Sequence, residues 1–285
     1  MATIKGRAPA KVNLTLHVTG QRTDGYHLLD SLVVFAGVFD QLTATTAPTL
    51  QLSVTGPFSH GVPTDERNIV MRAAKALQAA RGVTTGAAIT LEKHLPHAAG
   101  IGGGSADAAI ALTMLADLWG VDPLPDHAPE VTALGADVPV CLQAPNPTHM
   151  QGIGDNLSAV ADLPECAIVL VNPQVTVPTA PVFAALGEKR NPNMGILRAG
   201  MSYDDFCAWL GEQRNDLMAP AIAVAPEVEV AMNALRRMPL VGHVGMSGSG
   251  ATCYGIVKNA ADARQVARVI QVAHMNWWVA PAPIL

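Results

Sequence analysis

The clearest pattern near the start of the chain is a strict alternation of apolar and polar residues from Lys11 to Val18. The apolar positions are every second residue: Val12, Leu14, Leu16 and Val18. A period of two predicts a half-buried strand, because successive side chains of a strand point to opposite faces. We therefore expect the aliphatic side chains to face the core, with Lys11 and Asn13 together on the opposite face.

Shorter patterns predict the remaining elements. The strongest helices are the alanine-rich segment 68–81, which ends before Gly82, and the segment 105–119. Other helices are predicted at 179–186, 203–211, 227–237 and 260–272, and strands at 29–35, 41–45, 50–54, 87–93, 167–171, 241–246, 252–257 and 276–280. Strands and helices alternate too irregularly for a doubly wound sheet, so we expect an α+β fold. Loops at 144–147 and 152–155 suggest two domains, residues 1–158 and 159–285.

Composition then limits the class of protein. With 285 residues, 49% of them hydrophobic, the chain can bury the cores of one large or two medium domains. Its net charge of -5 argues against a protein that coats nucleic acid. The four cysteines form no C-x-x-C pair and no zinc-like spacing, which favours free thiols in a reducing compartment. With neither a signal peptide nor a membrane-length apolar run, we expect a cytoplasmic protein without nucleic-acid or membrane partners.

The glycine-rich segment from Gly100 to Ser105 is the strongest chemical signal. It lies between a predicted strand and a predicted helix, an order that a flexible linker rarely has. Glycines let backbone amides approach a ligand closely, and a helix N-terminus adds unpaired N–H groups and a positive dipole end. The segment therefore predicts a phosphate site. It is neither a Walker A loop, which would end in Gly-Lys-Ser/Thr, nor the dinucleotide fingerprint.

Three further segments are weaker alone. Lys11 could simply be solvated, but it shares its face with Asn13, and a turn ending in Tyr26 and His27 follows. Asp137 lies between small residues and a proline, where it could form a turn or serve as the carboxylate that a phosphoryl-transfer enzyme needs at the attacking hydroxyl. The small-residue segment 246–252 could be a tight hairpin or a loop that closes over phosphates.

In this order, these segments resemble the GHMP kinase superfamily. The resemblance is carried by Pro9–Asn13, by residues 95–109 around the glycines and by Met246–Ala251, and it spans nearly the whole chain. It implies a two-domain α+β fold, with a ribosomal-S5-domain-2-like N-terminal domain and a ferredoxin-like C-terminal domain. It also implies a kinase that uses ATP and Mg2+.

One segment points to a particular substrate class. Arg22 to Leu29 resembles the cytidine-binding turn of superfamily members that act on a cytidine diphosphate substrate. These members phosphorylate the 2-hydroxyl of its methylerythritol moiety, in the non-mevalonate route to isoprenoids. For the oligomeric state, we expect a monomer or a weak homodimer.

The resemblance also implies a set of site residues. Asp137 would be the general base and Lys11 its orienting partner, with Ser105 as a Mg2+ ligand. ATP would contact Pro96, His97, Ala98, Ala99, Gly100, Ile101, Gly102, Gly103, Gly104, Ser105 and Ala106. The substrate would contact Asn13, Tyr26, His27 and Phe183. The loop near the phosphates would be Ser247, Gly248, Ser249 and Gly250.

Some positions depart from the family pattern. Val140 and Cys141 stand where aromatic residues are usual, and Gln151 and Asp155 replace an arginine and a glutamate.

Two alternative functions remain open. The first is a homoserine- or mevalonate-type kinase, whose substrate would have no base to stack on Tyr26 and Phe183. The second is a non-catalytic nucleotide-binding protein, which would need neither Lys11 nor Asp137.

Overall fold

The computed structural model describes residues 3–160 and 162–285, and the chain divides into two compact units that are interleaved in sequence. The first unit contains the chain up to Ala10, Val38–His97 and Gly102–Ala144, and the second contains Lys11–Gly37, Ala98–Ile101 and Pro145–Leu285. Strands β1 (Thr3–Asn13) and β3 (His27–Ala47) contribute residues to both. The predicted α+β class is confirmed. The predicted domain division after residue 158 stays a prediction.

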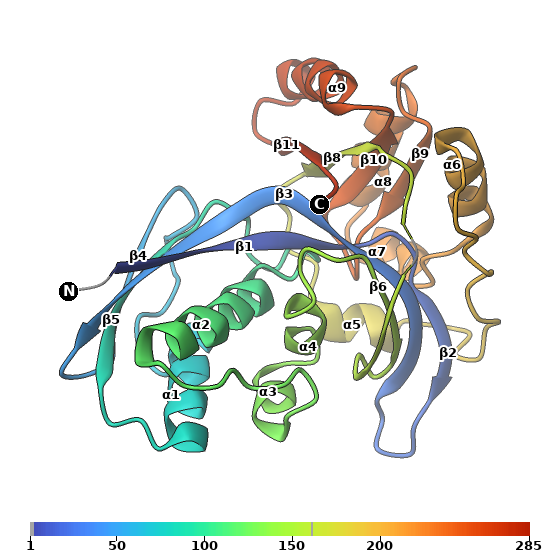
Figure 1. Ribbon diagram of the computed structural model, residues 1–285. Helices are drawn as coiled ribbons and strands as arrows, with labels where there is room; N and C mark the ends of the chain where they lie inside the picture. The colour runs from blue at the N-terminus through green and yellow to red at the C-terminus, as the bar shows by residue number, and fades with distance from the viewer. Residues whose placement is uncertain (1–2, 161) are drawn as a thin grey trace. The chain divides into compact units, whose positions relative to one another are not determined.

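The first unit packs helices against one sheet. Its strands follow the order β4 (Gln51–Thr55), β5 (Gly86–Glu92) and β3, with β4 parallel and β3 antiparallel to β5. Helices α1 (Ile69–Arg81) and α2 (Gly103–Trp119) pack on each other (Figure 1). Two short helices follow, α3 (Pro129–Leu134) and α4 (Val138–Cys141). Asn68 caps α1 by accepting the Val70 amide, and Gly82 ends the helix in the left-handed conformation, as its sequence predicts.

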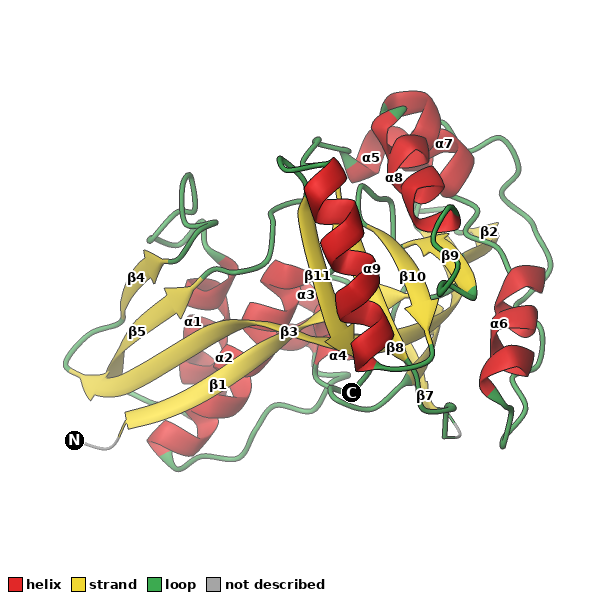
Figure 2. Cartoon of the chain, turned by 90° about the horizontal axis from the view of Figure 1, so that it is seen from above, coloured by secondary structure: helices red, strands yellow, loops and turns green. Residues whose placement is uncertain are grey.

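The second unit contains an antiparallel four-stranded sheet. Its order is β11 (Trp278–Pro283), β8 (Ala167–Asn172), β10 (Cys253–Val257) and β9 (His243–Met246). Helices α8 (Glu227–Arg236) and α9 (Ala260–Ala273) pack on it, and Figure 2 shows α9 along β11 and β8. Both helices cover the face formed by Ala167, Val169 and Val171, which lie in the same core cluster as the helices' apolar residues. This βαββαβ arrangement is the ferredoxin-like pattern.

The second unit contains further strands and helices. Strand β2 (His17–Gln21) is antiparallel to β3, and so is β6 (Thr148–Gly152), which also pairs with β7 (Asn156–Ala159). Three helices complete the unit: α5 (Thr179–Ala184), α6 (Tyr203–Glu212) and α7 (Met218–Val224).

The structure corrects several predicted elements. The strand expected at 11–18 is interrupted, since β1 ends at Asn13 and β2 begins at His17, and the strands expected at 29–35 and 41–45 are parts of the single strand β3. Helix α2 begins at Gly103, two residues before the predicted start. The last strand begins later than predicted and includes two prolines, which an edge strand tolerates because its outer N–H groups need no partner. Strands β6 and β7 and helices α3, α4 and α7 were not predicted.

The prediction of a half-buried strand from Lys11 to Val18 is also wrong, because both faces are covered. The aliphatic residues are buried as expected, but Lys11 is only 3% exposed and Asn13 only 1%. Polar partners make this burial possible, as described below. Among residues 3–160 and 162–285, no helix is both long and apolar enough to span a bilayer.

Candidate functional site

The glycine-rich segment turns sharply before α2. Ala98, Gly100 and Gly102 all have positive φ angles, of 47°, 73° and 61°, and Gly102 occupies the N-cap position. The amides of Gly103, Gly104 and Ser105 have no partner within the helix, because they belong to its first turn. No acidic residue lies in that turn. The end of α2 therefore combines unpaired N–H groups with a positive dipole end, which suits a phosphate.

Within the second unit, the start of the glycine segment packs against the connection between β9 and β10. A Cβ atom on Gly100 would lie 2.5 Å from the Ser247 carbonyl oxygen and 2.7 Å from that of Gly250, so no side chain fits there. The Ser247 hydroxyl donates to the Gly100 carbonyl at 2.8 Å, and the Thr252 amide donates to the Ala99 carbonyl at 3.1 Å. The segment 246–252 is thus a hairpin connection that also fixes the glycine segment.

Lys11 and Asn13 are hydrogen-bonded to the same two segments. The Lys11 amide donates to the Ile101 carbonyl at 2.9 Å, and the Asn13 amide donates to the Ser247 hydroxyl at 3.1 Å. The Lys11 ammonium donates to Asn13 Oδ1 at 2.8 Å, which confirms that the two side chains share a face. Asn13 Nδ2 in turn donates to Ser31 Oγ at 2.8 Å. The second unit therefore brings together three of the segments that the sequence analysis selected.

The turn before β3 presents an aromatic surface. The Arg22 amide donates to the Tyr26 carbonyl at 2.8 Å and closes the turn, where the Tyr26 side chain is 58% exposed. The His27 ring stacks on Phe183 of α5, with ring centroids 4.9 Å apart and planes inclined by 29°. Two rings from residues far apart in the sequence thus stack on each other.

His27 has an unusual polar atom at this face. Its Nε2 is buried and has no hydrogen-bond partner in the described part of the chain. Burial lowers the pKa of His27, and the nearby positive charge of Lys189 lowers it further. The imidazole is therefore neutral at pH 7, and its buried Nε2 is open to a hydrogen bond with a water molecule or a ligand.

Asp137 lies in the first unit, at the N-cap position of α4, and its side chain caps no amide of that helix. The Val138 amide donates instead to the Gly135 carbonyl at 3.0 Å. Val140 and Cys141, the departures from the family pattern, are buried core residues of this helix. Because Lys11 belongs to the other unit, the predicted pairing of Lys11 with Asp137 stays a prediction.

One buried ionic cluster escaped the sequence analysis. In the first unit, the Lys93 ammonium donates to Asp40 and, at 2.8 Å, to Asp107 Oδ2. A Cβ atom on Gly103 would lie 3.6 Å from that ammonium, so the cluster sits beside the first turn of α2. The sequence does contain a sign of this cluster, because Asp107 is a charged residue within an alanine-rich helix.

Comparison with known proteins adds independent information. The pattern of the N-terminal domain of GHMP kinases matches residues 68–155, and that of the C-terminal domain matches residues 197–275. The 4-diphosphocytidyl-2-C-methyl-D-erythritol kinase of Jannaschia sp. (strain CCS1) is 52% identical over 284 residues, covering 100% of this chain and 98% of the relative. The enzyme of that name from Cereibacter sphaeroides (strain ATCC 17029 / ATH 2.4.9) is 53% identical over 277 residues, covering 96% of this chain and 97% of the relative.

The chain belongs to the 4-diphosphocytidyl-2-C-methyl-D-erythritol kinase family of GHMP kinases. A crystal structure of a 4-(cytidine 5'-diphospho)-2C-methyl-D-erythritol kinase agrees, with a TM-score of 0.79 and 31% identity over 98% of this chain and 99% of that one. The Methanococcus jannaschii mevalonate kinase, at a TM-score of 0.68 and 11% identity over 100% and 99% of the two chains, shares the fold alone. The predicted family, fold class and enzyme class are confirmed, and membership in this family implies ATP as the phosphate donor.

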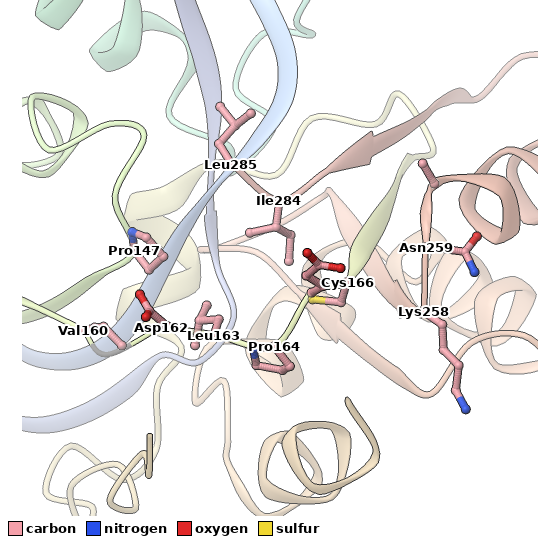
Figure 3. Close-up of a pocket in the computed structure, with 12 residues that line it drawn as sticks. Pro147, Val160, Asp162, Leu163, Pro164, Cys166, Lys258, Asn259, Ile284 and Leu285 are labelled. Atoms are coloured by element: carbon pink, nitrogen blue, oxygen red, sulfur yellow. The ribbon is translucent and has the colours of Figure 1, made fainter. Parts of the chain in front are cut away.

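One other possible site differs from this one. A pocket in the second unit lies between the segment around Cys166 and the start of α9 (Figure 3). It contains none of the residues selected from the sequence. No group of three or more His, Cys, Asp or Glu side chains that could hold a metal ion occurs in residues 3–160 and 162–285.

Proposed function

We propose that this family member transfers the γ-phosphoryl group of ATP to the 2-hydroxyl of 4-diphosphocytidyl-2-C-methyl-D-erythritol. The observation that carries the choice of substrate is the His27–Phe183 pair, whose ring centroids lie 4.9 Å apart, with the exposed Tyr26 next to His27 in the sequence. Stacking of a base on such side chains contributes about 1–3 kcal/mol in nucleic-acid binders. A homoserine- or mevalonate-type substrate has no base that would use this surface.

His27 adds a polar contact to this surface. A neutral imidazole carries one N–H donor and one acceptor nitrogen, and the unpartnered Nε2 can take either role toward the edge of a cytosine. Tyr26 and Phe183 would contact the faces of the base. Asn13, which is held by Ser31 and Lys11, would orient the erythritol end.

The transfer step needs a carboxylate at the attacking hydroxyl. We assign Asp137 as the general base, which would accept or orient the hydroxyl proton while the oxygen attacks phosphorus and the ADP oxygen leaves. Lys11 would orient this carboxylate through its positive charge. Asp137 and Lys11 would thus act in the transfer step, and Tyr26, His27 and Phe183 would bind the base.

ATP would be held through its phosphates. Residues 96–106 would surround them, the amides at the start of α2 would donate to their oxygens, and Ser247 to Gly250 would close the site beside Gly100. Mg2+ keeps several waters and needs few protein ligands, so the Ser105 hydroxyl in the first turn of α2 suits an ion that arrives with ATP. Such an ion would neutralise charge on the transferred phosphoryl group.

Turnover with Asp137→Asn tests this assignment. We expect the rate constant for phosphorylation to fall by about 10²-fold or more, because general base catalysis typically contributes about 10²–10⁴-fold. The affinity for ATP, measured separately, should stay close to that of the wild type. Product is followed by phosphorus NMR, with homoserine and mevalonate as competing substrates. Near-normal turnover by the variant would remove Asp137 from the mechanism, and phosphorylation of mevalonate or homoserine alone would overturn the substrate.

A further inference from the structure

A lysine lies beside the aromatic pair at the base-binding turn. The Lys189 ammonium donates to Gln21 Oε1 at 3.2 Å, and Gln21 Nε2 donates to the Gly25 carbonyl at 3.0 Å. Gln21 therefore ties Lys189 to the turn that carries His27. The positive charge of Lys189 also lowers the pKa of the His27 ring, although burial of the ring has the larger effect.

The backbone around Lys189 is fixed by hydrogen bonds, and the residue itself is half-buried. The Glu188 carboxylate accepts the amides of both Lys189 and Arg190, each at 2.8 Å. Two residues further on, the amide and the Nδ2 of Asn191 both donate to the Val18 carbonyl at 3.1 Å. The segment is thus anchored to β2, and the base of the Lys189 side chain keeps one position relative to His27.

The charges near this lysine favour an anionic ligand. Arg22 of the same turn already pairs with Asp24 at 2.7 Å, so its charge is offset. The nearby carboxylate of Glu188 points its Oε1 to two backbone amides. Lys189, in contrast, donates to a neutral amide oxygen, and its positive charge has no carboxylate within the ion-pair distance among the described residues.

We propose that Lys189 binds the phosphate adjacent to the ribose of the cytidine diphosphate substrate, an inference that rests on the proposed function. The ribose separates the base from the first phosphate, so a cation beside the stacking pair, rather than on it, lies where that phosphate arrives. Lysine binds phosphate as a flexible point charge.

Affinities for cytidine, CMP and CDP test this assignment. The affinities are measured by titration calorimetry for the wild type, Lys189→Ala, Lys189→Arg and Lys258→Ala, the last a control at an exposed lysine. We expect Lys189→Ala to reduce the preference for CMP and CDP over cytidine by about 3- to 10-fold, as for a charged contact near the surface. Lys189→Arg should keep most of the preference, Lys258→Ala all of it, and added salt should weaken it in the wild type.

The comparison with cytidine separates the possible failures. An unchanged affinity of Lys189→Ala for cytidine shows that the variant is folded and that its base site is intact. If this variant retains the wild-type ratio of CDP to cytidine affinity, the assignment of Lys189 is wrong while the proposed function stands. A wild-type protein that binds none of the three cytidine ligands would overturn the proposed function and, with it, this inference.

Discussion

The buried cluster of Lys93, Asp40 and Asp107 makes a quantitative prediction about stability and pH. One ammonium faces two carboxylates, and the side chains of all three are at most 5% exposed. Asp40 Oδ1 also accepts the amides of His94 and Leu95, whereas Asp107 Oδ1 has no partner among the described residues. Asp107 is therefore the carboxyl that takes a proton, and burial raises its pKa to about 7.

The direction of the effect follows from proton binding. An unfolded Asp107 would have its ordinary pKa of 3.8, so between that pH and about 7 the folded chain holds a proton that the unfolded chain has lost. Stability from this group is therefore present at low pH and is lost as pH rises through this window, by about 1.4 kcal/mol per pH unit. Between pH 5 and 8 the loss amounts to about 2–3 kcal/mol.

The substitution Asp107→Asn isolates this contribution, because asparagine keeps an oxygen for Lys93 but does not titrate. Urea unfolding at pH 5, 6, 7 and 8 should show that the variant gains about 2–3 kcal/mol on the wild type across this range. Asp117→Asn, an exposed position on the same helix, is the control and should follow the wild type at every pH. A constant difference in unfolding free energy between Asp107→Asn and the wild type would refute a protonated Asp107.

Two further predictions concern the glycine segment and the base. Gly100→Ala should cost about 1–3 kcal/mol in unfolding free energy, because Gly100 has a φ of 73° and faces the Ser247 carbonyl, whereas Gly187→Ala, with open space around it, should change little. Equal losses in the two urea titrations would contradict the close approach seen at Gly100. Tyr26→Ala should weaken CDP binding by about 1–3 kcal/mol and leave ATP binding unchanged in calorimetry; a similar loss for both ligands would count against stacking.

Much of the local structure was predictable from the sequence. Helices α1 and α9 depend on apolar spacing and on caps such as Asn68, and these are local properties. The glycine segment and the 246–252 connection could be recognised because their residue types are rare outside sharp turns. The family could be inferred from the order of these segments along the chain. That order can be read from the sequence without knowing which residues are in contact. The pairing of Asp137 with Lys11 remains a prediction from that resemblance.

Other features required the tertiary structure. Alternation from Lys11 to Val18 predicts one polar face, but whether water or protein covers that face depends on distant residues such as Ser31 and Ser247. The contacts of Lys93 with Asp40 and of His27 with Phe183 join residues 53 and 156 positions apart, so no local pattern records them. Sequence by itself determined which residues could do chemistry here. Only the folded chain decided which of them lose water and meet, because burial and pairing are properties of neighbours in space.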